Sequence, residues 1–135
     1  MDPYELEHQH TRRHAKVTAL LQRRYGYSGF RAHQYRIIRE IILGRDVCAV
    51  LPTGYGKSLT YQIPAIYTRR PAVVVSPLIS LMADQCASLQ RIGVPACAFN
   101  SEVADRGQML REIRAGEYQV IYITPESLVR GVVRE

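Results

Sequence analysis

The sequence predicts an α/β fold in which a parallel sheet is flanked by helices. From about residue 46 onward, short apolar runs alternate with segments whose apolar residues recur at helical spacing, which is typical of strand–helix–strand units. The composition supports a globular chain, because 47% of the 135 residues are hydrophobic and 22% are charged. No apolar run is long enough to cross a bilayer and the N-terminus is polar, so we expect an intracellular protein. Its expected place is the nucleus in a eukaryote and the cytoplasm in a bacterial or viral context.

Two helices are expected ahead of the first strand. Residues 1–10 are polar and are expected to fray. The first helix follows from Thr11 with apolar residues on one face. The second helix spans about residues 32–43, where a stripe of isoleucines precedes Gly44 as a C-terminal stop.

Four strands are expected in the rest of the chain. Each is a short apolar run: 46–51, 72–76, 96–99 and 119–123. The helices expected between and after them are a short one ending near Pro64, then about 78–92, about 104–115, and the start of another in the closing residues 126–135. Because helical crossovers join parallel strands, these helices should cover both faces of the sheet.

The three cysteines, Cys48, Cys86 and Cys97, are spaced too widely for a local zinc pattern. Each has apolar neighbours, so we expect all three to be small buried core residues. Another potential metal-binding pattern is the tract of His8, His10 and His14. The sequence places no cysteine or acidic ligand set beside it, which favours a solvated helix over a metal site.

The formal net charge of +6, with an isoelectric point of about 9.5, favours a polyanionic partner such as nucleic acid. Arginine pairs occur at 12–13, 23–24 and 69–70. They are equally compatible with a nucleic-acid surface and with an ordinary solvated exterior.

The segment TGYGKS, residues 53–58, lies between an expected strand and an expected helix, which is where a phosphate-binding loop belongs. Gly54 and Gly56 let backbone N–H groups turn toward an anion. Lys57 can reach the β- and γ-phosphates, and the Ser58 hydroxyl can bind Mg²⁺. The common form of this loop has a glycine where this chain has Leu51. The alternative is a glycine-rich turn that happens to precede a lysine.

Five segments in fixed order carry a family resemblance: FRAHQ (30–34), LPTGYGKS (51–58), LTYQIPA (59–65), VVVSPLISLMADQ (73–85) and YITPE (122–126). With them, the chain resembles the first RecA-like domain of RecQ-type DNA helicases, a branch of helicase superfamily 2, over about Tyr25 to Glu126. On this resemblance, residues 1–24 form an N-terminal polar segment and helix. Residues 25–135 form a partial RecA-like, ATP-binding helicase domain.

The resemblance implies a site for ATP and Mg²⁺. In YGYSGFRAHQ, Tyr27 would stack on the adenine ring, Arg31 would pack beside it and Gln34 would hydrogen-bond its edge. Taken alone, this glutamine would fit a solvated helix face. The loop residues that would hold the phosphates are Thr53, Gly54, Tyr55, Gly56, Lys57 and Ser58, with Lys57 and Ser58 in catalytic roles and Ser58 as the metal ligand.

The resemblance also implies contacts with single-stranded or forked DNA. Ser76, Ser80 and Gln85 lie in the segment similar to the family's DNA-contacting helix region. Asn100 and Thr124 follow expected strands, at the ends where ligands approach open α/β sheets.

Two parts of a complete helicase motor do not occur in this sequence: the D-E-x-H motif and a second RecA-like domain. We therefore expect a RecA-like fold that is truncated before the D-E-x-H strand. The expected function is the ATP-binding and DNA-contacting part of a RecQ-like 3′–5′ DNA helicase. The alternative left open is a degenerate fragment that binds nucleotide or nucleic acid without hydrolysis. A small phosphate-loop kinase is disfavoured by Leu51 and by the upstream FRAHQ element.

Overall fold

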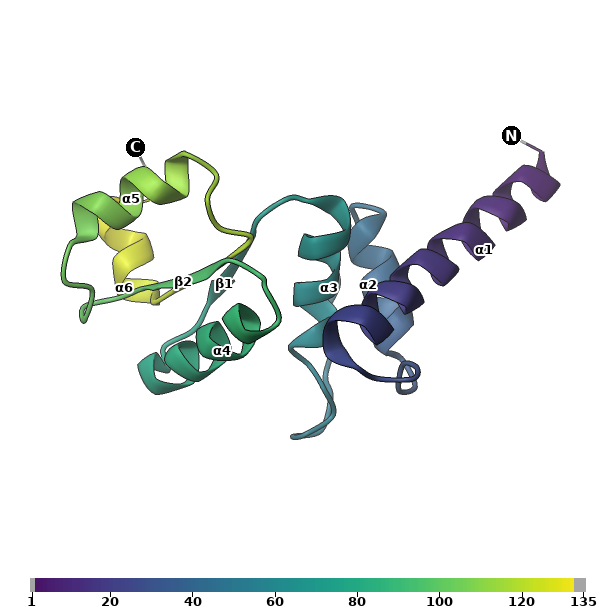
Figure 1. The fold of residues 1–135 in the computed structure, drawn as a ribbon, viewed down its shortest axis with the longest axis horizontal. Helices are drawn as coiled ribbons and strands as arrows, with labels where there is room; N and C mark the ends of the chain where they lie inside the picture. Colours follow the sequence, from purple (N-terminus) through teal and green to yellow (C-terminus); the bar gives the residue numbers. More distant parts are fainter. Residues whose placement is uncertain (1, 133–135) are drawn as a thin grey trace. The chain divides into compact units, whose positions relative to one another are not determined.

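The computed structural model describes residues 2–132. They form two compact units, one up to Thr68 and one from Arg69 (Figure 1). The expected boundary between residues 24 and 25 stays a prediction. In the described part of the chain, no helix combines the length and apolarity needed to span a bilayer.

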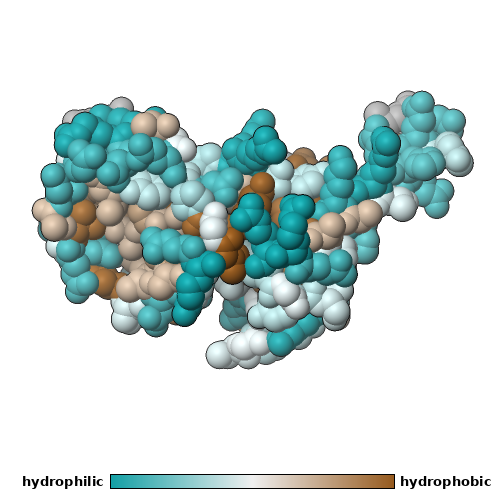
Figure 2. Space-filling view, viewed as in Figure 1, coloured by the Kyte–Doolittle hydropathy of each residue, from teal (hydrophilic) through white to brown (hydrophobic). Residues whose placement is uncertain are grey.

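The first unit is helical. It contains α1 (Pro3–Leu20), a π-helical continuation η1 (Leu21–Tyr25), α2 (Gln34–Ile42) and α3 (Leu59–Thr68). Its core brings one face of each helix together through the buried residues Val17, Leu20, Leu21, Ile38, Leu59 and Ile63. The N-terminal part of α1 projects away from this core (Figure 1). Figure 2 shows mostly hydrophilic side chains along the projecting part.

The expectation that residues 1–10 fray is wrong for the described ones, because α1 already begins at Pro3. Asp2 caps the helix: its carboxylate accepts a hydrogen bond from the Tyr4 N–H at 3.2 Å. Proline at the first helical position has no N–H to leave unpaired. A good cap therefore starts the helix inside a polar stretch.

The expectation that the helix after the phosphate loop ends near Pro64 is also wrong. α3 continues to Thr68 with Pro64 inside it. The proline removes one helical hydrogen bond, but Ile63, Pro64 and Ala65 are all buried. Tertiary packing of this apolar turn holds the helix together despite the lost bond.

Residues 46–51, expected to form a buried strand, form no strand, and most of the segment is exposed. Val50 is 93% exposed and Cys48 is exposed, so its expected core position is wrong. A strand is stable only when a neighbour pairs with its backbone, and no described residue pairs with this segment.

The second unit holds a parallel three-stranded sheet. The strands are β1 (Ala72–Val75), β2 (Ala96–Phe99) and β3 (Val120–Ile123), in the order β1-β3-β2. The helices are α4 (Ile79–Arg91), α5 (Arg106–Arg114), the short α6 (Pro125–Ser127) and η2 (Leu128–Val132). Figure 1 shows α4 on one face of the sheet and α5 and α6 on the other, as crossover connections require.

These elements confirm the predictions of the three later strands and of the helices at about 78–92 and 104–115, whose ends differ from the predicted ones by at most two residues. The expected closing helix is present as α6 and η2, and its last residues, 133–135, lie outside the described part. All four residues of β3 are buried at the centre of the sheet, and Cys86 and Cys97 are buried as expected. β1 is an edge strand with Val73 and Val75 exposed.

Candidate nucleotide-binding site

The phosphate-loop segment forms tight turns that lead directly into α3. The Tyr55 N–H donates to the Pro52 carbonyl at 3.2 Å. Gly54 and Gly56 have φ values of 78° and 80°, in the left-handed region that favours glycine. Lys57 and Ser58 directly precede α3, whose N-terminal end carries the positive pole of the helix dipole and so attracts anions.

Gln34, the first residue of α2, is 2% exposed, so its alternative position on a solvated face is wrong. Its side-chain oxygen accepts from the Arg31 N–H at 2.8 Å. Its Nε2 donates to the carbonyls of Tyr55 and Gly56, both at 3.2 Å. One buried amide therefore joins the FRAHQ element to the phosphate loop. Its contact with adenine stays a prediction.

Gly56 fits under this amide only because it has no side chain. A Cβ at this position would lie 2.4 Å from Gln34 Nε2, well inside contact distance. By contrast, a Cβ at Gly54 would meet nothing within 4 Å. The two glycines thus share a backbone conformation, but only Gly56 is needed for close packing.

Arg31 and Tyr55 make a second connection between the same two segments. Arg31 Nη1 donates to the Gly54 carbonyl at 2.7 Å, and its guanidinium lies 5.9 Å from the centre of the Tyr55 ring. The Tyr55 hydroxyl donates to the Ala32 carbonyl at 2.9 Å. These bonds fix the loop against the start of α2.

A cavity of about 260 Å³ opens beside this connection. Its lining is Tyr27, Ser28, Gly29, Arg31, Gln34, Gly54, Gly56 and Leu59. Five expected ligands of the nucleotide line it together: Tyr27, Arg31, Gln34, Gly54 and Gly56. Ligand pockets usually measure about 300–1,000 Å³, so this cavity suits a planar base rather than a complete nucleotide.

The remaining expected phosphate ligands lie outside the cavity lining. Thr53 and Lys57 are exposed, whereas Tyr55 and Ser58, the residue just before α3, are half-buried. This arrangement leaves the loop accessible to phosphates that extend from a base in the cavity. Ser28, Gly29 and Leu59 were not named as ligands from the sequence, although they lie within or beside the segments that suggested the site.

The predicted nucleic-acid contacts gather at one edge of the sheet. Ser76, Asn100 and Thr124 directly follow β1, β2 and β3, whose last residues are in register: Val75 and Phe99 both pair with Ile123. The Ser76 N–H also donates to the Ile123 carbonyl at 3.0 Å. The carboxyl ends of the parallel strands therefore bring these three residues side by side.

Two of these side chains already serve the fold. Thr124 is buried, and its hydroxyl accepts from the Ser127 N–H at 3.3 Å as the N-cap of α6. Asn100 is buried, and its oxygen accepts from the Glu102 N–H at 2.9 Å.

The other predicted DNA contacts are more accessible. Ser76 is half-buried at the end of β1, while Ser80 is exposed and Gln85 is half-buried on α4. Contacts of all five predicted residues with DNA stay predictions.

The histidine tract lies on α1, where His8, His10 and His14 are exposed. Between residues 2 and 132, no three histidine, cysteine or acidic side chains gather into a group that could hold a metal ion.

The DEAD/DEAH box helicase family model matches residues 31–135 of the sequence. The chain belongs to the DEAD/DEAH box helicase family. The match takes in the FRAHQ element except Phe30, the phosphate loop and the whole second unit. α1 precedes it.

Curated relatives of this DEAD/DEAH box chain include RecQ-type helicases, which confirms the resemblance seen in the motifs. It is 43% identical to the bifunctional 3′-5′ exonuclease/ATP-dependent helicase WRN of Mus musculus, over 83% of this chain and 8% of WRN. It is 39% identical to the ATP-dependent DNA helicase RecQ of Bacillus subtilis, over 84% of this chain and 20% of RecQ.

A protein of Acanthamoeba polyphaga mimivirus, whose name describes an ATP-dependent RNA helicase, is 48% identical over 96% of this chain and 24% of its own length. The chain thus spans a quarter or less of each of these three relatives.

A solved structure supports the fold. The crystal structure of a hypothetical ATP-dependent RNA helicase from Sulfolobus tokodaii matches with a TM-score of 0.66 and 19% identity, over 87% of this chain and 37% of that one. The RecA-like α/β fold class is confirmed.

Proposed function

We propose that the chain is the ATP-binding and DNA-contacting part of a RecQ-like 3′–5′ DNA helicase that couples ATP hydrolysis to strand unwinding. The observation that supports this most strongly is the buried Gln34 amide bound to the carbonyls of Tyr55 and Gly56. It places a base-sized cavity directly beside the phosphate loop. Such an arrangement suits a nucleotide, because a base and a phosphate chain need adjacent but chemically different surroundings.

In this proposal the Tyr27 ring stacks on one side of the base. Tyr27 lines the cavity and is 57% exposed, so its ring is accessible to a ligand. Lys57 and the N–H groups at the start of α3 hold the phosphates. The Ser58 hydroxyl would bind Mg²⁺, and Mg²⁺ would neutralise charge on the bound triphosphate. The residues present fit ATP·Mg²⁺ binding. A loop with two glycines of positive φ is followed by Lys57 and then by the N-terminus of α3.

The same proposal assigns one DNA strand to the edge formed by Ser76, Asn100 and Thr124, with Ser80 on α4. Parallel strands present their carboxyl ends there, and Ser80 is exposed. DNA is favoured over RNA because the motifs are of RecQ type and relatives of that type carry DNA helicase names. Fluorescence anisotropy titrations with DNA and RNA oligonucleotides of the same sequence, under the same conditions, would test this preference for DNA. Tighter binding of the RNA would contradict it.

Binding of ATP is tested by titrating the chain with a fluorescent ATP derivative. Lys57→Ala should weaken binding by more than about tenfold, the size expected for loss of a charge-assisted phosphate contact. The chain has one other lysine, Lys16, exposed on α1, and Lys16→Ala is the matched control. Equal affinities for the two variants would contradict the proposed site.

A non-hydrolysing nucleotide binder is the second candidate, favoured by the lack of any Asp-Glu pair in the sequence. DNA-stimulated ATP turnover separates the two. We expect binding without turnover by this chain alone, and turnover that is restored when D-E-x-H and a second RecA-like domain are joined to it.

A further inference from the structure

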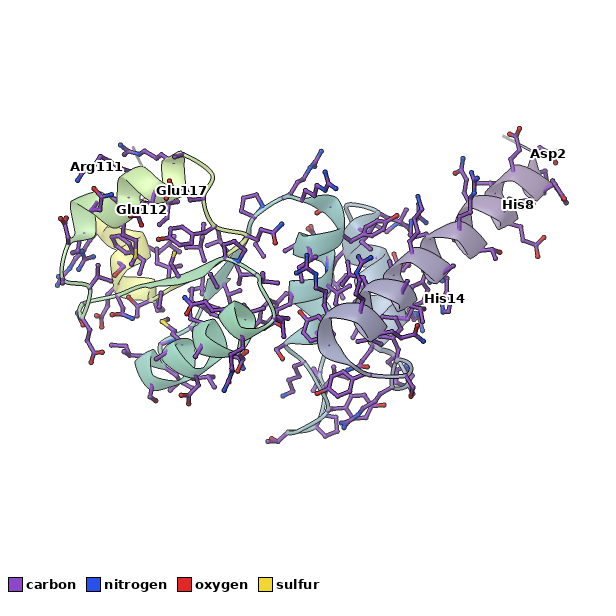
Figure 3. All side chains as sticks on the ribbon, viewed as in Figure 1. Asp2, His8, His14, Arg111, Glu112 and Glu117 are labelled. Atoms are coloured by element: carbon purple, nitrogen blue, oxygen red, sulfur yellow. The ribbon has the colours of Figure 1, made fainter. Side chains whose placement is uncertain are left out.

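One face of α1 changes its chemistry along the helix. Residues 10, 13, 14, 17 and 20 recur at the three- and four-residue spacing that puts them on one side. At the C-terminal end of this face, Val17 and Leu20 are buried in the core of the first unit. Toward the N-terminus the same face carries His10, Arg13 and His14 instead. Figure 3 shows His14 near α2 and His8 farther out on the projecting part.

α2 and the residues after it form an opposite wall. Two cavities of about 440 and 430 Å³ lie between the walls, and both are lined by His10 and Arg39. The rings of His14, on α1, and Tyr35, on α2, pack edge to face with their centres 4.4 Å apart, so the two walls are in contact there. We call these two adjoining cavities the α1–α2 groove, defined by His10, Arg13, His14, Tyr35, Arg39, Glu40 and Arg45.

The groove is cationic. Arg13, Arg39 and Arg45 line it, and Glu40 is the one carboxylate among its lining residues. Glu40 Oε2 accepts from Arg45 at 2.7 Å and its Oε1 from Arg39 at 3.2 Å. These hydrogen bonds, that of Arg45 foremost, lower the pKa of Glu40 and keep it charged. The excess of positive charge remains after this neutralisation.

Tyr35 shows that two of the guanidiniums act on the same space. Burial raises the pKa of its hydroxyl, and the positive charges of Arg13, from α1, and Arg39, from α2, oppose that rise. Like charges on facing walls repel each other, and an anion between them would relieve the repulsion. The three arginines of the groove carry hydrogen-bond donors and no acceptor.

We propose that the α1–α2 groove binds the phosphodiester backbone of a nucleic acid strand, as a contact additional to the strand ends of the second unit. Arginine forks match phosphate oxygens, and the groove offers them from both walls. The choice of nucleic acid among polyanions rests on the proposed function. One wall, α1, precedes the residues that the helicase family model matches.

The test compares two double variants of the full chain by fluorescence anisotropy with a labelled oligonucleotide. Arg13→Gln with Arg39→Gln removes one charge from each wall. Arg12→Gln with Arg36→Gln removes the same charge from the same helices, at exposed positions outside the groove lining. The groove variant should lose about tenfold in affinity, and its salt slope should fall by about 1.4–1.8 (about 0.7–0.9 per phosphate contact), against less than threefold for the control. Equal losses would overturn the proposal.

Glu40→Gln gives a result that misfolding cannot imitate. It removes the groove's one carboxylate, so the oligonucleotide should bind about threefold or more tighter and the salt slope should steepen. Unchanged affinity would contradict the groove. Polyglutamate of equal charge should compete more weakly than unlabelled oligonucleotide. Equal competition would assign the groove to an acidic protein segment and overturn the nucleic-acid proposal.

The groove and the nucleotide site can fail separately. The groove double variant should bind the fluorescent ATP derivative with the affinity of the unchanged chain. Lys57→Ala should keep the salt slope of oligonucleotide binding. If Lys57→Ala left the affinity for the ATP derivative unchanged while the groove double variant weakened oligonucleotide binding, only the proposed function would be refuted. The reverse result would refute only the groove.

Discussion

Residues 46–51 and residues 72–75 have the same kind of sequence, a short run dominated by apolar and β-branched side chains, but only the second run forms a strand. β1 has β3 beside it and pairs along its whole length. The segment 46–51 has no paired neighbour among the described residues and lies exposed. The difference shows that apolar sequence supplies the tendency to extend, whereas a backbone partner decides whether a strand forms.

The two candidate sites differ in a related way. In the first unit the loop that would hold phosphates is kept in shape by buried polar bonds from Gln34, while Lys57 stays exposed. In the second unit the side chains of Asn100 and Thr124 are themselves buried and bonded within the fold. A phosphate at the strand ends would therefore meet backbone and the more accessible serines first.

The largest contrast between the units should appear in thiol reactivity. Cys48 is exposed, whereas burial raises the pKa of Cys86 to about 11 and that of Cys97 to about 12. At pH 8, a thiol-reactive chromogenic disulfide should modify one cysteine at least about 100-fold faster than the other two, because the thiolate is the reacting form. Cys48→Ser should remove the fast phase. Three equally fast thiols would show that the sheet does not protect its cysteines.

Phe99→Ala tests how far the sheet supports the second unit. The ring is buried and Arg106 lies over it, 4.7 Å from its centre. The variant should lower the free energy of unfolding by about 3–5 kcal/mol, the usual cost of a large cavity. Urea denaturation measures the loss, and amide exchange should rise first in β1, β2 and β3. Exposed Val50→Ala in the unpaired segment is the control, with an expected change within about 0.5 kcal/mol.

Gly56→Ala and Gly54→Ala form a matched pair within the phosphate loop. Both need a left-handed backbone, which costs a residue with a side chain roughly 1–2 kcal/mol. Only the Cβ at 56 also displaces the Gln34 amide, so its variant should lose about 1–3 kcal/mol more. Thermal unfolding and ATP titration measure both effects. Equal losses for the two variants would show that the Gln34 contact contributes little.

The smallest effect concerns pH and the second unit. The Tyr118 hydroxyl donates to Glu112, which lies on α5 in Figure 3, and this bond lowers the pKa of Glu112 and raises that of Tyr118. The bond therefore stabilises the fold above the ordinary carboxyl pKa of 4.5 and below the ordinary phenol pKa of 10.0. Tyr118→Phe should lower the Tm by a few degrees at pH 7 and leave it nearly unchanged near pH 3. An equal decrease at both values would point to lost packing.

Much of the second unit could be predicted from the sequence, since each strand and helix there has a strong local pattern and a neighbour to pair with. Asp105 caps α5 and Gly116 ends its turn, so even these boundaries have a local cause. The first unit was harder. Pro64 stays helical because its neighbours are buried, and that burial is a property of the packed core rather than of the local sequence.

The phosphate loop could be located from its spacing of glycine, lysine and serine. The motif did not show which of its carbonyls would be bound, nor that one buried amide would bind two of them. That information depends on where α2 lies relative to the loop, across about twenty residues of sequence. The α1–α2 groove could not be predicted either, because Arg13 and Arg39 are distant in sequence and line one cavity only through the packing of the two helices.

The contact between Gln34 and Gly56 couples the substitutions that are tolerated at these two positions. A side chain at 56 has no room while the amide occupies that space, and a shorter residue at 34 would leave two carbonyls without a donor. Descendants of this sequence can therefore change either position only when the other changes soon after. Among homologues, substitutions at these two sites should therefore occur together.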